Sequence, residues 1–222
     1  IGLLIAALVS AQASDESLAG ENPLSFGVFG LLLGSMCIIT LGVLTTASEY
    51  GTGMIRTTMT ACPSRARVLA AKSIVFFAVA FTVTFASVLL VALADVSLLQ
   101  GAKSPSGSEW LKGTFGISLY IALLGLLSLL VGSIIRHSAG AITIMIALVL
   151  APLVMALFMF ADSLESVRQA LFDYSIPSQL SVFYTHSLSN SGPTGWDPLW
   201  IALGVTAVAF AVAVSLLQSR DV

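Results

Sequence analysis

Residues 68–94, VLAAKSIVFFAVAFTVTFASVLLVALA, decide the fold class because they form a long apolar run with almost no charge. Lys72 is the single charged residue in this run. A helix needs about 20 apolar residues to cross the roughly 30 Å of hydrocarbon in a bilayer. The segment therefore predicts a transmembrane helix, and we expect other parts of the chain to be built in the same way.

The composition of the whole chain is that of an integral membrane protein. Hydrophobic residues make up 57% of it and charged residues 9%, whereas a soluble domain is about one quarter charged. The net charge is −2 and no basic domain is present, which argues against a nucleic-acid partner. Cys37 lies in an apolar run and Cys62 in a basic segment, so we predict two free thiols, no disulfide and no metal site.

Apolar runs predict a single all-α transmembrane domain that covers residues 1–222. Five runs are long enough to cross a bilayer: 24–47, 68–94, 115–135, 139–161 and 199–217. We interpret a shorter run, 1–11, as a truncated first span, which gives six spans in total. The alternative for this run is a signal-peptide core followed by a cleavage-like Ala-Gln-Ala. An outer segment, 162–197, precedes the last span.

Basic residues predict the orientation, because lysine and arginine are retained in the cytoplasm. If the segments 48–67 and 136–138 are cytoplasmic, most basic residues lie inside, namely Arg56, Arg65, Arg67, Lys72, Arg136 and Arg220. Lys103, Lys112 and Arg168 then lie outside. We therefore expect a multi-pass protein with both termini in the cytoplasm.

Acidic residues are expected at the two membrane faces and not within the spans. Glu49 and Asp221 fall at the inner face, and the others fall in outer segments: Asp15, Glu16, Glu21, Asp95, Glu109, Asp162, Glu165, Asp173 and Asp197. A carboxylate at mid-membrane costs about 3 kcal/mol on insertion scales and usually marks an ion or proton relay. Because none is expected there, transport would take its energy from another polypeptide.

A structured hairpin is predicted between the second and third spans, in ASEYGTGMIRTTMTACPSRARVLAAK, residues 47–72. Glu49 would end the second span near the headgroups. Gly51 and Gly53 would let the backbone turn, and Thr52 would cap a short helix. That helix would be amphipathic and would lie under the membrane, because apolar residues recur at helical spacing: Met54, Ile55, Met59 and Cys62.

The second half of this hairpin leads into the third span. Pro63 would end the short helix and Ser64 would cap the next one. Lys72, seven residues after Arg65, would share a face of that helix with it. On residue types alone, an equally good interpretation is that these cations fix the topology and hold anionic lipid headgroups, each worth about 1 kcal/mol near the surface.

The order of residues in the hairpin resembles a family signature. Glu49, Gly51-Thr52-Gly53, Arg56, Pro63-Ser64-Arg65 and Lys72 are similar to the segment between the second and third spans of type 2 ATP-binding cassette (ABC) exporter permeases. Six spans, a long outer segment and a C-terminal Arg220-Asp221-Val222 are similar to bacterial members of that family.

The resemblance implies a permease subunit in a bacterial plasma membrane that moves a hydrophobic or amphipathic substrate outward. Its partners would be a second permease (an identical copy or a close paralogue), two copies of a cytoplasmic ABC ATPase and membrane lipid. ATP and Mg would bind to the ATPase, and no cofactor to this chain, which has no phosphate-binding loop motif. The resemblance assigns ATPase coupling to Glu49, Tyr50, Gly51, Thr52, Gly53, Arg56, Pro63, Ser64, Arg65 and Lys72, with Glu49 and Arg56 as the charged contacts.

A substrate cavity between two permeases would lie along the second and fifth spans, as in the family. Its lining would include Ser35, Met36, Thr40, Met145, Pro152, Met155 and Phe158. Pro152 is expected to kink the fifth span. Packing in the core or against lipid is the alternative for each of these residues singly.

Two further patterns predict local packing. Gly30 and Gly34 form a small-residue strip that lets helices approach closely, within one subunit or between two, and Ser128 with Gly132 forms a weaker one. In the outer segment, Asp162 and Glu165 resemble a capping box at the start of an amphipathic helix, whose apolar face would hold Leu164, Val167, Leu171 and Tyr174. This helix would lie on the outer leaflet or cover an exit path.

Two other function classes stay open at this point. An intramembrane enzyme would need ionisable or nucleophilic groups that meet at one depth, and the spans offer scattered serine and threonine residues. A membrane scaffold would fit if the hairpin bound a partner without ATPase activity.

Overall fold

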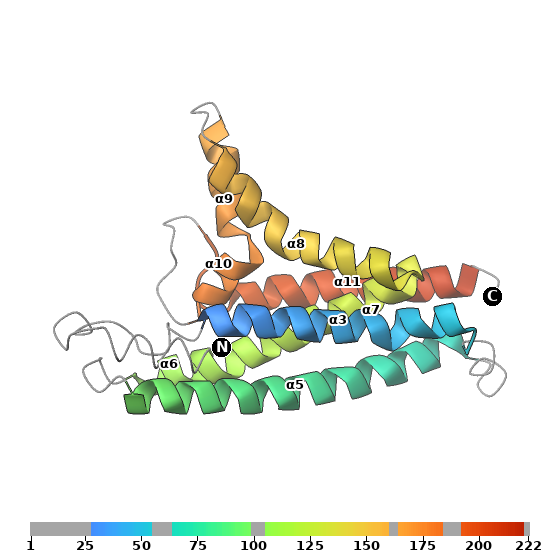
Figure 1. Cartoon of the computed structure of the whole chain (residues 1–222), viewed down its shortest axis with the longest axis horizontal. Coiled ribbons are helices and arrows are strands. Elements are labelled where there is room, and N and C mark those ends of the chain that lie inside the picture. Colours follow the sequence, from blue (N-terminus) through green and yellow to red (C-terminus); the bar gives the residue numbers. More distant parts are fainter. Residues whose placement is uncertain (1–27, 55–63, 99–104, 160–163, 184–191, 220–222) are drawn as a thin grey trace. The chain divides into compact units, whose positions relative to one another are not determined.

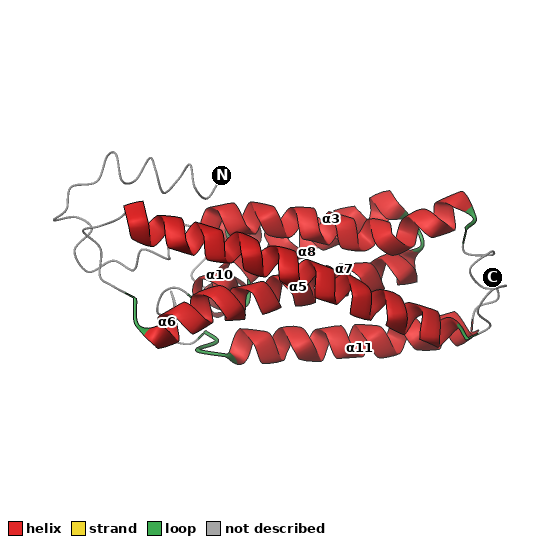
Figure 2. Cartoon of the chain, turned by 90° about the horizontal axis from the view of Figure 1, so that it is seen from below, coloured by secondary structure: helices red, strands yellow, loops and turns green. Residues whose placement is uncertain are grey.

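The computed structural model describes residues 28–54, 64–98, 105–159, 164–183 and 192–219. These residues form helices and no strand (Figures 1 and 2). Five helical runs are long and apolar enough to cross a membrane: α3 (Val28–Thr52), α5 (Arg65–Leu98), the run Gly107–Ile135, α8 (Ser138–Phe158) and α11 (Asp197–Ser219). The chain is thus a multi-pass membrane protein, and five predicted spans are confirmed. The sixth, 1–11, lies outside the described residues.

Several helices are longer than the apolar runs that predicted them. α3 continues beyond residue 47 to Thr52, and α5 begins at Arg65 and continues to Leu98. The run that ends at Ile135 begins at Gly107 and consists of α6 (Gly107–Leu111), the π-helix η2 (Lys112–Gly116) and α7 (Ile117–Ile135). Hydropathy detects only the part of a helix that lies in hydrocarbon, whereas its backbone hydrogen bonds continue into the headgroup region.

A capping box begins α6. The N–H of Glu109 donates to Ser106 Oγ at 3.4 Å, and the N–H of Ser106 donates to Glu109 Oε2 at 2.6 Å. The Ser-x-x-Glu spacing is a sequence signal for the start of a helix, and it lies before the apolar run 115–135. The capping box predicted for the outer segment involves Asp162, which lies outside the described residues. α9 (Glu165–Asp173) begins after Leu164, which makes no side-chain capping bond.

The contacts divide the chain into two compact units, which we call unit 1 (1–34, 83–120 and 149–199) and unit 2 (35–82, 121–148 and 200–222). The residues of the predicted single domain, 1–222, thus fall into these two units. The apolar window of Gly107–Ile135 is 78% buried, whereas those of the other four spans are at most 39% buried. The other spans therefore leave broad apolar faces exposed, as expected for helices that contact lipid.

Unit 2 has a core of Leu69, Leu129, Leu130, Ala213 and Leu217, which come from α5, α7 and α11. α3 joins this core through close contact with α7. The hydroxyl of Thr46 on α3 donates to the carbonyl oxygen of Leu129 on α7 at 2.8 Å. Interhelical hydrogen bonds of this kind hold membrane helices together where the hydrophobic effect cannot.

Glycines allow the contact between α3 and α7 in unit 2. A Cβ added at Gly42 would lie 2.1 Å from Ser128 Oγ and 2.5 Å from the carbonyl oxygen of Gly125. A Cβ added at Gly132 would lie 2.8 Å from Thr46 Oγ1, so the Ser128 and Gly132 pair does pack closely, as predicted. At Gly34, which belongs to unit 1, nothing described lies within 4 Å of an added Cβ, so the described residues show no close packing there.

Unit 1 anchors the outer segment onto α7. α10 (Ile176–Ser181) begins at Ser175, whose Oγ accepts a bond from the N–H of Ser178 at 3.3 Å. The hydroxyl of Tyr120 donates to Gln179 Oε1 at 3.2 Å, and both side chains are buried. The ring of Phe183 lies 6.0 Å from that of Tyr120. α10 is therefore part of the folded core of this unit.

Candidate functional site

The C-terminal end of α3 carries the first part of the candidate site, in unit 2. α3 continues through Glu49, Tyr50 and Gly51 and ends at Thr52. The backbone turn predicted at Gly51 is therefore wrong, and so is the prediction that Thr52 opens the next helix. Gly53 does turn the backbone, with φ of +72° in the left-handed region that glycine adopts most easily.

An ion pair joins the end of α3 to the beginning of α5. The Nζ atom of Lys72 donates a hydrogen bond to Glu49 Oε2. The two side chains are 24% and 25% exposed, so both charges are largely withdrawn from solvent. The resemblance predicts that Glu49 contacts the ATPase, and the spacing predicts that Lys72 lies on the same helix face as Arg65. The structure instead brings these two motif residues together, 23 positions apart in the sequence.

The turn between α7 and α8 contributes a second contact to the same helix end. Arg136 follows α7 with a positive φ of 59°, and its N–H donates to the carbonyl oxygen of Gly132 at 3.0 Å. Its guanidinium carbon lies 5.0 Å from the centroid of the Tyr50 ring. This is cation–π geometry, which is worth about 0.5–1 kcal/mol at exposed sites and more when desolvated.

The neighbouring helix starts are well defined. Ser64 directly precedes α5, as predicted, and its carbonyl oxygen accepts bonds from the N–H groups of Arg67 and Val68 at 3.1 and 3.2 Å. His137 precedes α8, and its Nδ1 atom accepts a bond from the N–H of Gly140 at 3.1 Å. Arg65 is the first residue of α5.

We call Glu49, Tyr50, Lys72 and Arg136 the inner cluster. Its members come from α3, α5 and the end of α7, and they hold fixed charges of both signs. The described residues contain no group of three or more His, Cys, Asp or Glu side chains that could hold a metal ion. The inner cluster links three helix ends. Because it holds two cations and one anion, it can also attract an anion. The other predicted coupling residues, Arg56 and Pro63, lie outside the described residues.

The residues predicted to line a substrate cavity do not lie together in one unit. In unit 2, Ser35 and Met145 are buried and Met36 and Thr40 are half-buried. In unit 1, Met155 and Phe158 are 55% and 74% exposed, and Pro152 is half-buried inside α8. Four of these side chains thus pack within helices of unit 2, and two face outward.

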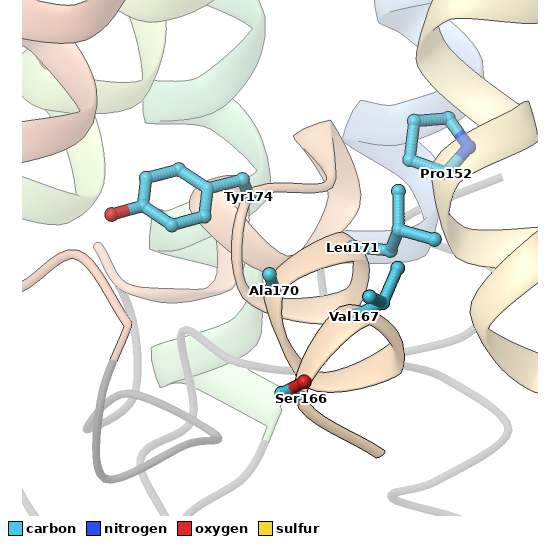
Figure 3. A pocket seen from close by; sticks show the side chains of 6 residues that line it. All are labelled: Pro152, Ser166, Val167, Ala170, Leu171 and Tyr174. Atoms are coloured by element: carbon cyan, nitrogen blue, oxygen red, sulfur yellow. The ribbon is translucent and has the colours of Figure 1, made fainter. Parts of the chain in front are cut away.

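Pro152 lines an open groove of about 510 Å³ in unit 1 (Figure 3). The other lining residues belong to α9 or follow it: Ser166, Val167, Ala170, Leu171 and Tyr174. Val167 and Leu171 lie on the side of α9 toward Pro152. The predicted amphipathic helix is therefore confirmed as a helix, and Val167 and Tyr174 on its predicted apolar face are exposed.

Asp95 is a residue that the sequence reasoning placed wrongly. It was assigned to an outer segment, but it lies in the last turn of α5 and is 1% exposed. Neither of its carboxylate oxygens has a hydrogen-bond partner in the structure as described. The sequence does hold a signal for this position: Asp95 directly follows the apolar run 68–94, and a helix commonly continues beyond such a run.

No model of a known protein family matches this chain, and no curated protein matches it significantly.

Proposed function

We propose that this chain is the membrane-spanning permease subunit of a type 2 ABC exporter. The observation that carries the proposal is the Glu49–Lys72 ion pair. Both residues belong to the signature that the hairpin resembles, and an ion pair between them gives that signature a physical role. It ties the helix before the hairpin to the helix after it.

An ion pair between these two helices suits a subunit whose helices are moved by another protein. In the proposed assembly, two ATPase subunits bind ATP and Mg and close against each other beneath two permeases. The hairpin between α3 and α5 would be displaced by that closure. Because Lys72 holds Glu49 and Arg136 contacts Tyr50, the ends of three helices would move as one body. Two discrete helix arrangements with different affinities for substrate then give outward transport.

The ion pair changes the role proposed for Glu49. Its carboxylate is engaged within the chain, so it is not free to serve as the main charged contact with the ATPase. That contact would fall to Arg56 and to Arg67, which is exposed on the first turn of α5. In this scheme both termini and the hairpin face the cytoplasm of a bacterium, and the substrate is hydrophobic or amphipathic.

Affinity purification of tagged chain from its native membranes tests the assembly. We expect an ABC ATPase to co-purify. Arg56→Ala should lower the amount recovered, whereas Lys72→Gln should leave it unchanged and reduce the ATP hydrolysis that the permease stimulates. Glu165→Gln, on exposed α9, is the matched charge control and should change neither quantity. If native membranes yield no ATPase partner, the proposal is wrong, and a partner without ATPase activity would favour a scaffold.

A double-mutant cycle tests the ion pair itself. Glu49→Gln and Lys72→Gln should each reduce stimulated hydrolysis, and the double variant should lose little more than either single variant. The coupling energy expected for a partly exposed pair is about 1 kcal/mol. Strictly additive losses would show that the two side chains act separately.

Asp95 favours a second candidate function, an ion- or proton-dependent carrier. A buried carboxylate without a partner is costly, and such groups in membrane helices usually belong to ion or proton pathways. If this candidate is correct, a hydrophobic carbodiimide should label Asp95, sodium or acidification should change the rate of labelling, and Asp95→Asn should abolish transport in membranes that lack ATP. Transport that requires ATP and survives Asp95→Asn would exclude it.

A further inference from the structure

A groove of about 420 Å³ lies in unit 2 beside the inner cluster. Thr45 of α3 forms part of its lining, and the rest comes from α5: Ala71, Lys72, Val75, Phe76 and Val79. The ends of the α5 stretch, Ala71 and Val79, are eight positions apart, which corresponds to about 12 Å of helix. The groove is therefore an apolar depression along a membrane helix, and the stem of Lys72 lines it near one end.

One side of this groove is closely packed. The ring of Phe76 packs against the two glycines at the contact between α3 and α7. Its Cζ atom lies 3.2 Å from a Cβ added at Gly42, and its Cε1 atom lies 3.1 Å from one added at Gly125. Because neither glycine has a side chain that could yield, the ring position depends on the backbones of two helices. The groove is thus built into the fold and does not depend on a loose surface side chain.

The open side of the groove faces away from the rest of unit 2. Val75 and Val79 are 63% and 58% exposed, and Thr45 and Ala71 are exposed as well. In a membrane helix such an open apolar face meets lipid acyl chains. Lys72 lies in the second turn of α5, where a lysine stem can follow the apolar surface while its ammonium stays at headgroup depth.

We propose that this groove binds one phospholipid with an anionic headgroup. An acyl chain lies along Val75, Phe76 and Val79, and the phosphate accepts a hydrogen bond from Lys72 Nζ. An ammonium group has three donors, and the bond to Glu49 uses one of them. Glu49, Lys72 and Arg136 of the inner cluster together carry one net positive charge, so charge complementarity favours an anionic lipid over a neutral one at this position.

Binding of this lipid places a second anion beside Glu49. Two acceptors then share one ammonium, so the headgroup weakens the Glu49–Lys72 ion pair. The lipid site does not depend on the proposed export function, because it requires only this chain and a bilayer. If both proposals hold, the content of anionic lipid sets how firmly α3 and α5 are joined.

Photo-crosslinking of the full chain in lipid nanodiscs tests the site. One preparation contains phosphatidylglycerol with a diazirine on its acyl chain, and the other contains phosphatidylcholine with the same probe. Peptide mass spectrometry then measures labelling at Val75 and Val79. We expect about fivefold more labelling by the anionic lipid, which is the ratio equivalent to the ~1 kcal/mol of one lysine near an anionic surface.

Paired variants separate lipid binding from loss of the ion pair. Lys72→Gln should abolish the preference for the anionic lipid, whereas Glu49→Gln breaks the same ion pair and should keep or raise it. Ala71→Phe should fill the groove and reduce labelling by both lipids. Ala147→Phe, at an exposed alanine of α8, is its control and should leave labelling unchanged.

Several outcomes would overturn the proposal. One is an equal preference for the anionic lipid in the unsubstituted chain and in Lys72→Gln. Another is labelling of Leu90 and Leu93, which are also exposed on α5, that is as strong as the labelling of Val75 and Val79. Displacement of the probe by inorganic phosphate would indicate a site for free phosphate. A disulfide between two Val75→Cys chains that excludes the probe would indicate that a second copy covers the groove.

Discussion

Replacing Gly42 by alanine should destabilise the protein, whereas the same change at Gly34 on the same helix should not. The added methyl carbon at Gly42 would lie 2.1 Å from Ser128 Oγ and 2.5 Å from the carbonyl oxygen of Gly125. The serine hydroxyl can rotate away. The carbonyl oxygen belongs to the backbone of α7, so α3 and α7 would have to separate. At Gly34 an added Cβ meets no described atom within 4 Å.

The size of the effect follows from comparing the two variants. Alanine is favoured over glycine in a helix by about 1 kcal/mol, and this gain applies at both positions and cancels in the comparison. What remains is the cost of overpacking, typically about 1–3 kcal/mol. Gly42→Ala should therefore have a lower free energy of unfolding than Gly34→Ala by that amount, a factor of about 5 to 150 in the equilibrium constant.

Equilibrium unfolding in mixed micelles, with helix content followed during a titration with sodium dodecyl sulfate, measures this difference. A double variant, Gly42→Ala with Ser128→Ala, identifies the obstacle. It should recover little stability, because the contact with the Gly125 carbonyl oxygen remains. Equal stability of Gly42→Ala and Gly34→Ala would refute the close contact between α3 and α7, and full rescue by Ser128→Ala would place the clash on the side chain alone.

Three further substitutions test single contacts by the same unfolding measurement. Thr46→Val removes the hydroxyl that bonds α7 and should cost about 0.6 kcal/mol, a typical value for hydrogen bonds between membrane helices; no loss would mean that the bond is not formed. Tyr120→Phe leaves the buried Gln179 carbonyl without its donor and should cost about 1–3 kcal/mol, with Phe183→Leu as a packing control. His137→Ala removes the acceptor for the Gly140 N–H and should cost about 1 kcal/mol, and His137→Asn should retain most of the stability.

The five described spans could be predicted because each depends on one property, a long apolar run. The helix ends could not, because charged and polar residues near the headgroups lower the hydropathy while the helix continues. Glu49 and Tyr50 belong to α3 although they follow its apolar run, and Asp95 belongs to α5 for the same reason. Hydropathy alone therefore does not reveal that α5 contains a buried carboxylate.

The contacts between helices were harder to predict than the helices. Gly34 and Gly42 both lie in α3 among apolar residues, yet only Gly42 packs closely against α7. A helix that is apolar on all sides carries no polar face to indicate its rotation. The spacing of small residues therefore shows where close packing is possible, and the rotation of the helix decides where it occurs.

Lys72 connects the two proposals, and the structure shows how they can be separated. The coupling proposal requires the bond between Lys72 and Glu49, whereas the lipid proposal requires the ammonium group and the apolar groove beside it. Glu49→Gln removes the first requirement and keeps the second, and Ala71→Phe does the reverse. If Glu49→Gln reduces hydrolysis while Ala71→Phe reduces only lipid labelling, one lysine serves two independent roles. If Ala71→Phe also alters hydrolysis, the bound lipid is part of the link between α3 and α5.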